Sequence, residues 1–319
     1  MPEALAVDAV DVTKRYGDLV AVDGISIQVD QGEVYGVLGP NGAGKTTFMR
    51  MLFGLIRPDG GEIRLFGRTW ERDGTRVLDD VAGFVETPRF YPYLTGRENL
   101  AGLARLDGGD SSERVDEVLD LVDLADRADD RVREYSYGMA QRLGVASSLL
   151  RHPRLLIVDE PANGLDPAGI RDMRALIKRL GDSGLTVLLS SHDMNEVEEI
   201  CDNVTIMRRG DVVFHGGIGQ LRAQAPQQGH RLSTDDDAHA LALARTHTQL
   251  TVRPVEDGGL SLAGDQAEVD RYIGALISAD VAVRSLEYTE TPLESLFFML
   301  TEDPEHEERF EHAVEAVGA

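Results

Sequence analysis

The chain has 319 residues, and its 32 basic and 56 acidic residues give a formal net charge of −24. The length suggests two domains, one of them sizeable, and the hydrophobic fraction of 42% is ample for a packed core and argues against disorder. So acidic a chain repels nucleic-acid phosphate, because binding to that backbone needs clustered Lys and Arg, and no nucleic-acid partner is expected. The acidity is explained equally by solubility and by adaptation to a salty cytoplasm, where salt screens repulsion between carboxylates.

The cysteine count and the hydropathy pattern bear on where the protein resides. The single cysteine, Cys201, cannot form an internal disulfide, which fits a reducing cytosol. The N-terminus lacks a signal-peptide pattern, and no apolar stretch approaches the roughly 18 residues needed to span a bilayer. We therefore expect a cytoplasmic protein that reaches a membrane only through a partner.

The first two thirds of the chain alternate between strand and helix patterns. Short apolar runs separated by turn residues predict strands in "ALAVDAV", "ISIQV" and "EVYGVLG", followed by a helix from about Lys45 to Gly54 and a strand in "GEIRLFG". From about Tyr93 to Arg151 the periodicity is helical, with one apolar face formed by Val115, Val118, Leu119 and Val122. Buried strands are expected in "RLLIVDE" and "LTVLLSSH". This order predicts a parallel α/β core with a helical insertion.

The composition changes near "RAQAPQQGH", which indicates a linker over 222–235 after a first domain of residues 1–221. Beyond it, alternating helix and strand patterns predict a small α/β domain over 236–302. The remaining segment, 303–319, is charged and is expected to form a loose tail.

A glycine-rich segment after the third predicted strand carries the strongest motif. "GPNGAGKTT" matches G-x-x-x-x-G-K-[ST] between a strand and a helix, a context that disfavours a chance lysine in an ordinary turn. Its backbone N–H groups would surround phosphate oxygens at the positive end of the helix. Lys45 would reach the β- and γ-phosphates, and Thr46 would place a hydroxyl on Mg²⁺. The predicted nucleotide contacts in this loop are Gly39, Pro40, Asn41, Gly42, Ala43, Gly44, Lys45, Thr46 and Thr47.

Two later strands end in polar residues suited to catalysis. "LLIVDEP" ends in two acids, of which Asp159 would hold Mg²⁺ and Glu160 would polarise an attacking water. An ordinary acidic strand-end turn is the alternative. His192 ends "LLSSH", and the carboxyl end of a parallel strand faces the ligand crevice.

The segment "EYSYGMAQRL", Glu134–Leu143, has two interpretations. Ser136 is a common type of N-cap and could simply begin a helix that stops before Pro153. The same helix N-terminus and hydroxyl could also face an anion. The decapeptide alone does not decide between them.

Taken together, these motifs resemble those of the ATP-binding cassette ATPases, over about Val7–Gly216. The phosphate loop, the 135–139 segment, Asp159–Glu160, "NGLD" at 163–166 and Ser191–His192 occur in that family's order. The family's Leu-Ser-Gly-Gly-Gln is here Tyr135-Ser136-Tyr137-Gly138-Met139, so that Ser136 and Gly138 match. The resemblance implies a P-loop ATPase core with a parallel sheet, an antiparallel β subdomain and a helical insertion, beside the small C-terminal α/β domain.

The resemblance also implies ligands and a second subunit. ATP and Mg²⁺ would be the cofactors, with Thr46, Glu86 and Asp159 as metal ligands and Glu160 and His192 as catalytic residues. Glu86 stands where the family has Gln. Two chains would bind head to tail, so that each presents Ser136, Gly138 and the Asp166 loop to the ATP of the other. Tyr16 matches the aromatic residue that stacks on adenine.

Two further stretches indicate which branch of the ATP-binding cassette family the chain resembles. "ETPRFYPYLTGRENL" and "PLESLFFMLTE" look like the branch that contains bacitracin and other drug exporters. The chain would then be the ATPase subunit of an exporter, held at the membrane by an integral permease on another polypeptide. The alternative, a soluble cassette ATPase in DNA or ribosome maintenance, predicts a coiled-coil insertion, tandem cassettes or a basic surface, which the sequence lacks. A P-loop kinase or GTPase would leave 135–139 unexplained.

Overall fold

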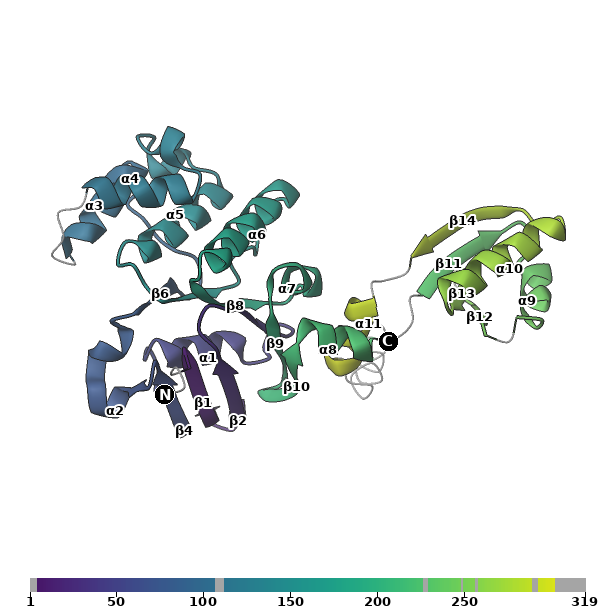
Figure 1. Ribbon diagram of the computed structural model, residues 1–319, viewed down its shortest axis with the longest axis horizontal. Coiled ribbons are helices and arrows are strands. Elements are labelled where there is room, and N and C mark those ends of the chain that lie inside the picture. The colour runs from purple at the N-terminus through teal and green to yellow at the C-terminus, as the bar shows by residue number, and fades with distance from the viewer. Residues whose placement is uncertain are drawn as a thin grey trace, which may run out of the picture. The chain divides into compact units, whose positions relative to one another are not determined.

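The computed structural model describes residues 5–106, 112–225, 229–247, 249–255, 258–288 and 292–301. The chain divides into two compact units, Met1–Ile218 and Gly219–Ala319, which are considered separately below (Figure 1). The charged tail predicted over 303–319 lies outside the described residues.

An antiparallel sheet begins the first unit. Its strands follow the order β2-β1-β4-β5, with bounds β1 Val7–Tyr16, β2 Leu19–Val29, β4 Gly60–Leu65 and β5 Arg68–Thr69. Val7, Ala9 and Val12 of β1 are buried, while Val10 and Asp11 are exposed, so the sheet turns one face toward the core. This sheet is the predicted antiparallel β subdomain.

Six of the described strands form a second sheet in the order β10-β9-β3-β8-β7-β6. The bounds are β3 Val34–Leu38, β6 Val81–Phe84, β7 Leu155–Asp159, β8 Thr186–Ser191, β9 Asn203–Arg208 and β10 Asp211–Gly217. Strands β3 and β6 to β9 are parallel, and β10 is antiparallel to β9. β3, β7 and β8 are buried along their whole length, as expected of parallel strands covered on both faces. Their carboxyl ends lie at one edge, where the predicted phosphate loop and acids follow.

Helix α1, Lys45–Leu52, connects the packing of the two sheets. Its Phe48, Met49, Met51 and Leu52 belong to one buried cluster with Ile25 and Leu65 of the antiparallel sheet and Tyr35 and Leu188 of the parallel one. Helix α1 is apolar on two sides, and both sides are buried because each packs against one of the two sheets. The cluster fixes the direction of α1 and so the position of its N-terminus.

The helical insertion lies between β6 and β7. It contains α3 Gly96–Leu106, α4 Ser112–Leu121 and α5 Tyr137–Leu149, and Figure 1 shows it on the side of the six-stranded sheet away from the antiparallel sheet. The predicted apolar face of Val115, Val118, Leu119 and Val122 is buried. Helix α4 ends at Leu121, earlier than its periodic pattern, because Asp123 adopts the left-handed region at φ 56°.

The remaining described helices of the first unit are short α2, Trp70–Asp73, then α6, Pro167–Asp182, and α7, Met194–Ile200. Three 3₁₀ turns occupy Gly74–Leu78, Ala125–Arg127 and Val132–Glu134. Helices α6 and α7 follow β7 and β8 respectively, so their N-termini begin near the same sheet edge as the predicted acids.

The second unit has an antiparallel sheet in the order β12-β13-β11-β14. Its elements are α8 Ile218–Gln224, β11 Gly229–Thr234, α9 Asp237–Ala244, β12 Thr251–Pro254, β13 Leu260–Ala263, α10 Gln266–Ser278, β14 Val283–Tyr288 and α11 Pro292–Thr301. Strand β11 lies inside the stretch predicted as a linker. Only His230 and Leu232 of this strand are buried, and its polar outward residues hide the strand pattern. Leu232 joins Leu262, Val269 and Tyr272 in a separate core.

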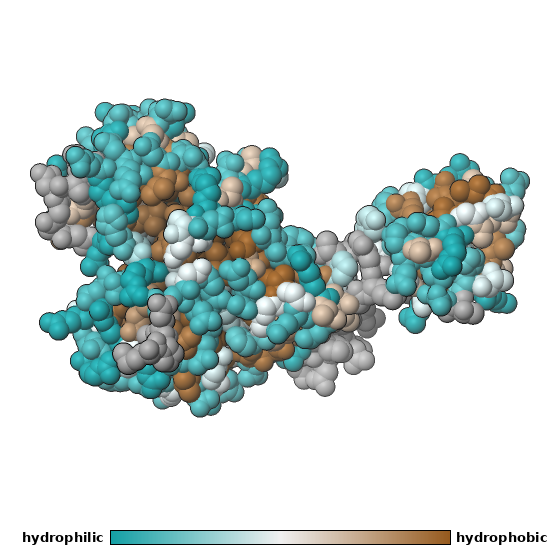
Figure 2. Space-filling model, viewed as in Figure 1, coloured by the Kyte–Doolittle hydropathy of each residue, from teal (hydrophilic) through white to brown (hydrophobic). Residues whose placement is uncertain are grey.

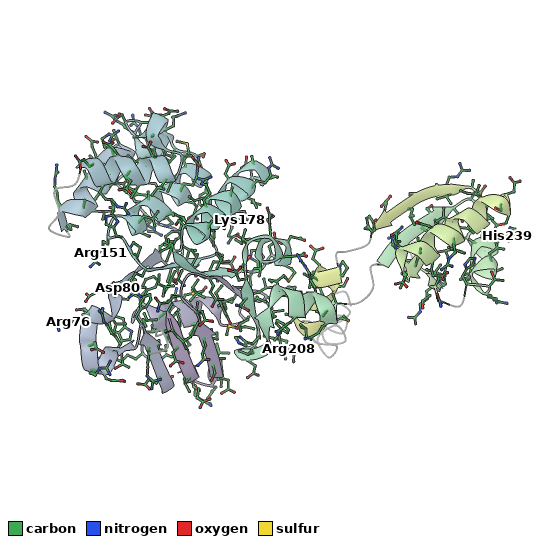
Figure 3. The ribbon with its side chains drawn as sticks, in the orientation of Figure 1. Arg76, Asp80, Arg151, Lys178, Arg208 and His239 are labelled. Atoms are coloured by element: carbon green, nitrogen blue, oxygen red, sulfur yellow. The ribbon has the colours of Figure 1, made fainter. Side chains whose placement is uncertain are left out.

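The face seen in Figure 2 is mainly hydrophilic. Exposed polar residues include Arg151, Lys178 and His239, which are labelled in Figure 3. Within the described ranges, no helix combines the length and the apolar character needed to cross a membrane.

Candidate nucleotide-binding and hydrolysis site

The segment Gly39–Thr47 runs from the end of β3 into the first turn of α1, and its glycines are required by geometry. Gly44 has φ 107°, and a Cβ on Gly39 would lie 2.4 Å from the carbonyl oxygen of Met207. The Lys45 Nζ donates hydrogen bonds to the carbonyls of Gly39 at 2.6 Å and Pro40 at 3.2 Å. The lysine therefore folds back over the loop that precedes it.

A cavity of about 530 Å³, which we call the phosphate-loop cavity, opens beside this loop. It brings together most of the predicted nucleotide contacts and is lined by Tyr16, Leu19, Val20, Ala21, Asn41, Gly42, Ala43, Gly44, Lys45, Thr46, Thr47, Glu160 and Arg209. Tyr16 is 46% exposed, so its ring is accessible to a planar ligand. Arg209, in the turn between β9 and β10, was not expected, because no motif marks it.

Glu160 stands between Lys45 and His192. Its Oε1 lies 3.1 Å from Lys45 Nζ, and its Oε2 lies 2.6 Å from His192 Nδ1. The Lys45 and Glu160 side chains are only 5% and 17% exposed, so each compensates a buried charge of the other. Glu160 has φ 50°, a left-handed conformation that is uncommon for this residue type and is concentrated at functional sites.

Ser190 holds both acids and was missed by the sequence analysis. It lies opposite Asp159 in the pairing of β8 with β7. Its hydroxyl donates a hydrogen bond to Asp159 Oδ1 and accepts one at 2.9 Å from the N–H of Glu160. The sequence shows only a serine at the end of an apolar strand. Its contact with Asp159 becomes apparent once the register between β7 and β8 is known.

A second cavity of about 290 Å³, here called the carboxylate cavity, adjoins the first. It is lined by Asn41, Thr46, Glu86, Thr87, Tyr137, Gln141, Asp159, Glu160 and Asn163. The three predicted metal ligands, Thr46, Glu86 and Asp159, thus border one space, and their oxygen donors are of the kind that Mg²⁺ prefers. The Glu86 carboxylate forms an ion pair with Arg50 of α1.

Five predicted nucleotide contacts line neither cavity of their own chain. Gly39 and Pro40 belong to the start of the phosphate loop, whereas Ser136, Gly138 and Asp166 lie elsewhere in the chain. Ser136 is the N-cap of α5 and accepts a hydrogen bond from Met139 N–H at 3.2 Å. Asp166 is the N-cap of α6 and accepts one from Gly169 N–H at 2.8 Å. Gly138 is not required by the local fold, since an added Cβ would come no closer than 3.6 Å, to Leu165 Cδ2.

Comparison with known proteins decides the family. Residues 22–163 match the family model described as ABC transporter. The bacitracin transport ATP-binding protein BcrA of Bacillus licheniformis is 36% identical over 295 residues, which cover 91% of this chain and 95% of the relative. The chain belongs to the ABC transporter family.

Two further matches extend this result. The daunorubicin/doxorubicin resistance ATP-binding protein DrrA of Streptomyces peucetius is 35% identical over 320 residues, covering 97% of this chain and 96% of the relative. The solved structure of cbiO1 from Clostridium perfringens, part of the ABC transporter complex cbiONQ, has a TM-score of 0.64 and 26% identity, covering 70% of this chain and 92% of that one. The chain is an ATP-binding and ATP-hydrolysing ABC subunit, which confirms the predicted fold class and ATPase activity. The roles predicted for single residues stay predictions.

In this ABC subunit, a buried network supports the loop that carries His192. Ser191 Oγ donates a hydrogen bond to Glu196 Oε2 at 2.6 Å. Glu196 is only 4% exposed, and burial raises its pKa above the usual value. Arg174 of α6 pairs with Asp193, the N-cap of α7, at 3.2 Å. The network ties the two helices that begin at the site and holds the loop between Ser191 and Asp193.

Proposed function

We propose that this subunit powers export through an integral membrane permease carried on a separate polypeptide. The support is the match over nearly the whole chain, C-terminal unit included, to ATP-binding proteins named for bacitracin transport and daunorubicin/doxorubicin resistance. No described helix could itself cross the bilayer, so attachment to the membrane would pass through the permease. The cargo would be a compound such as bacitracin, daunorubicin or doxorubicin, for which those relatives are named.

The observation that carries the hydrolytic assignment is the line of contacts Lys45–Glu160–His192 beside the phosphate loop. Lys45 would bind the β- and γ-phosphates as a point charge. Glu160 would accept a proton from the attacking water at a carboxylate oxygen, while His192 Nδ1 keeps that carboxylate in place. Tyr16, at the rim of the phosphate-loop cavity, would stack on adenine.

The residues of the carboxylate cavity would hold Mg²⁺ with the nucleotide. Thr46, Asp159 and Glu86 would be its protein ligands, and the ion would offset the charge of the phosphates. Ser190 fixes the Asp159 carboxylate for this purpose. Glu86 would be shared between the metal and Arg50, because both compete for one carboxylate.

A second chain would complete each site. Ser136, Gly138 and Asp166 contribute nothing to the cavities of their own chain, yet the N-terminus of α5 is suited to an anion. A head-to-tail pair of chains would place these residues on the γ-phosphate bound by the partner. The functional unit at the permease would therefore hold two ATP molecules between two subunits.

Two variants test the hydrolytic assignment. Lys45→Ala should lose binding of a fluorescent ATP analogue, because the cation facing the phosphates is removed. Glu160→Gln should still bind ATP, lose hydrolysis by about 10²- to 10⁴-fold, and accumulate as a dimer in size-exclusion chromatography. Near-normal affinity in Lys45→Ala would refute the phosphate-loop assignment, and normal turnover in Glu160→Gln would move the base elsewhere.

Export itself is tested on the complex. The full chain should co-purify with a multi-span permease encoded beside it, and inside-out vesicles containing both should accumulate bacitracin or daunorubicin only with ATP and intact Glu160. Co-purification with ribosomes or DNA instead would favour the soluble maintenance ATPase.

A further inference from the structure

Tyr137 occupies a position at which the family motif has glycine, and its hydroxyl has two partners. It accepts a hydrogen bond from Gln141 Nε2 at 3.1 Å and lies 3.2 Å from Thr87 Oγ1. Gln141 is 3% exposed, so this end of the network is fixed inside α5, whereas Tyr137 is 44% exposed. The hydroxyl thus links the first turn of α5 to a loop more than forty residues earlier in the chain.

The Tyr137 ring also lies beside the loop that follows Glu160. Gly164 has φ 77°, and a Cβ added there would lie 3.3 Å from Tyr137 Cε1. Gly164 lies between Glu160 and Asp166. One side chain therefore pairs with Thr87 on one side of the carboxylate cavity and lies beside the Gly164 loop on the other.

Thr87 directly follows Glu86, so the contact between Tyr137 and Thr87 connects Tyr137 to the backbone that carries Glu86. Glu86 borders the carboxylate cavity while its carboxylate pairs with Arg50. A metal ion in that cavity would compete with Arg50 for the carboxylate and would displace Thr87 with it. Tyr137 would transmit this displacement to its two sequence neighbours, Ser136 and Gly138.

We propose that Tyr137 is a positioning residue that couples the two ATP sites of the dimer. Tyr137 contacts Thr87, which follows Glu86 in the loop beside the chain's own ATP. The position of this loop therefore affects how Ser136 and Gly138 of the same chain are placed against the ATP of the partner chain. While Glu86 is held by Arg50, the Tyr137–Thr87 contact restrains the N-terminus of α5. This inference rests on the proposed head-to-tail dimer.

A mixture of two variant chains isolates the coupling. One chain carries Lys45→Ala and keeps its 135–139 segment, and the other carries Gly138→Asp and keeps its phosphate loop. Their heterodimer has one intact composite site, whose 135–139 segment comes from the chain that binds no ATP. Adding Tyr137→Phe to the Lys45→Ala chain removes the restraint, and the ATPase rate of the mixture should rise by about two- to fivefold, the range for one partly exposed hydrogen bond.

Matched variants separate coupling from a structural effect. Thr87→Val in the Lys45→Ala chain should give the same rise, and the double variant should give no more. Tyr272→Phe in that chain is the control, because its hydroxyl donates to the Ala240 carbonyl at 2.7 Å within the second unit and has no link to Thr87, so it should give no rise. A rate that Tyr137→Phe leaves unchanged or lowers overturns the coupling.

Measurements on the wild-type chain distinguish a failure of the proposed function from a failure of the coupling. Absence of ATP hydrolysis by the unmixed wild-type chain with its permease would contradict the proposed function. Wild-type hydrolysis together with a mixture that stays silent in every version would overturn the coupling and leave the proposed function standing.

Discussion

Glu196 shows how a single buried carboxyl can make the stability of this ATPase depend on pH. It accepts a hydrogen bond from Ser191 through Oε2, and Oε1 has no hydrogen-bond partner among the described residues. Burial is the main cause of its raised pKa. The folded chain therefore favours the protonated carboxyl more than the unfolded chain does, and stability decreases as the pH rises above the ordinary value of 4.5.

Replacing this carboxyl by an amide should remove that pH dependence. We expect the melting temperature of Glu196→Gln, relative to wild type, to increase between pH 4.5 and pH 8. Glu117→Gln is a control of opposite sign, because a hydrogen bond from Arg114 lowers the pKa of Glu117. Its carboxylate stabilises the fold fully above the ordinary value of 4.5 and loses this effect as the pH falls below it. For this variant the difference from wild type should therefore stay nearly constant between pH 4.5 and pH 8 and change only at lower pH. A flat or falling difference for Glu196→Gln would contradict the prediction.

Whether the role of a residue could be predicted depends on whether that role follows from a local sequence motif or from tertiary contacts. Lys45, Asp159 and Glu160 lie in short motifs whose spacing already contains the geometry, and the structure brings them to one sheet edge. Ser190 and Arg50 act on residues 31 and 36 positions away, so their roles appear only with strand register and helix packing. Contacts formed by tertiary structure leave no local pattern in the sequence.

At the level of elements, the N-terminus of α5 offers a decisive test. An acidic residue in the first turn of a helix is normally favourable, and Gly138 has room for a Cβ. Gly138→Asp should therefore fold and bind ATP. At about 4 Å from a phosphate of the partner, its carboxylate would cost on the order of 4 kcal/mol at intermediate dielectric, which should reduce turnover by about 10²-fold or more.

The matched control for that variant is Gly138→Ala, which adds volume without charge and should retain most of the activity. ATP affinity, ATPase rate and melting temperature should be measured for both. If Gly138→Asp turns over and dimerises like wild type, Ser136 and Gly138 serve only as the beginning of a helix.

Helices and strands could be predicted where one face, or the whole element, is buried and the sequence is therefore apolar in a regular pattern. The bounds of β7 and α1 follow from an uninterrupted apolar run and from the glycine loop. The end of α4 and the position of β11 were not predictable. Asp123 breaks a helix whose apolar spacing continues through Val122, and β11 has only two buried residues in a polar stretch.

For the whole molecule, the net charge of −24 governs the response to salt. Repulsion among carboxylates should be screened as the Debye length falls from about 10 Å at 0.1 M to about 3 Å at 1 M. We expect the melting temperature to rise between 0.1 and 2 M KCl, even though pairs such as Lys14–Asp59 weaken. A parallel series in sucrose controls for solute exclusion. Melting temperatures that stay flat or fall in KCl would leave solubility as the explanation of the acidity.

The contact between Lys45 and Glu160 has a consequence for the timing of the reaction. While Glu160 Oε1 lies on Lys45, that carboxylate oxygen is engaged by a buried cation and is a poor proton acceptor. A phosphate has more charge and more acceptor oxygens, so its arrival would draw Lys45 away and release the base. The order of events would then follow from one ion pair, because the proposed base, Glu160, would be freed only when the phosphate arrives and would stay blocked in a subunit without ATP.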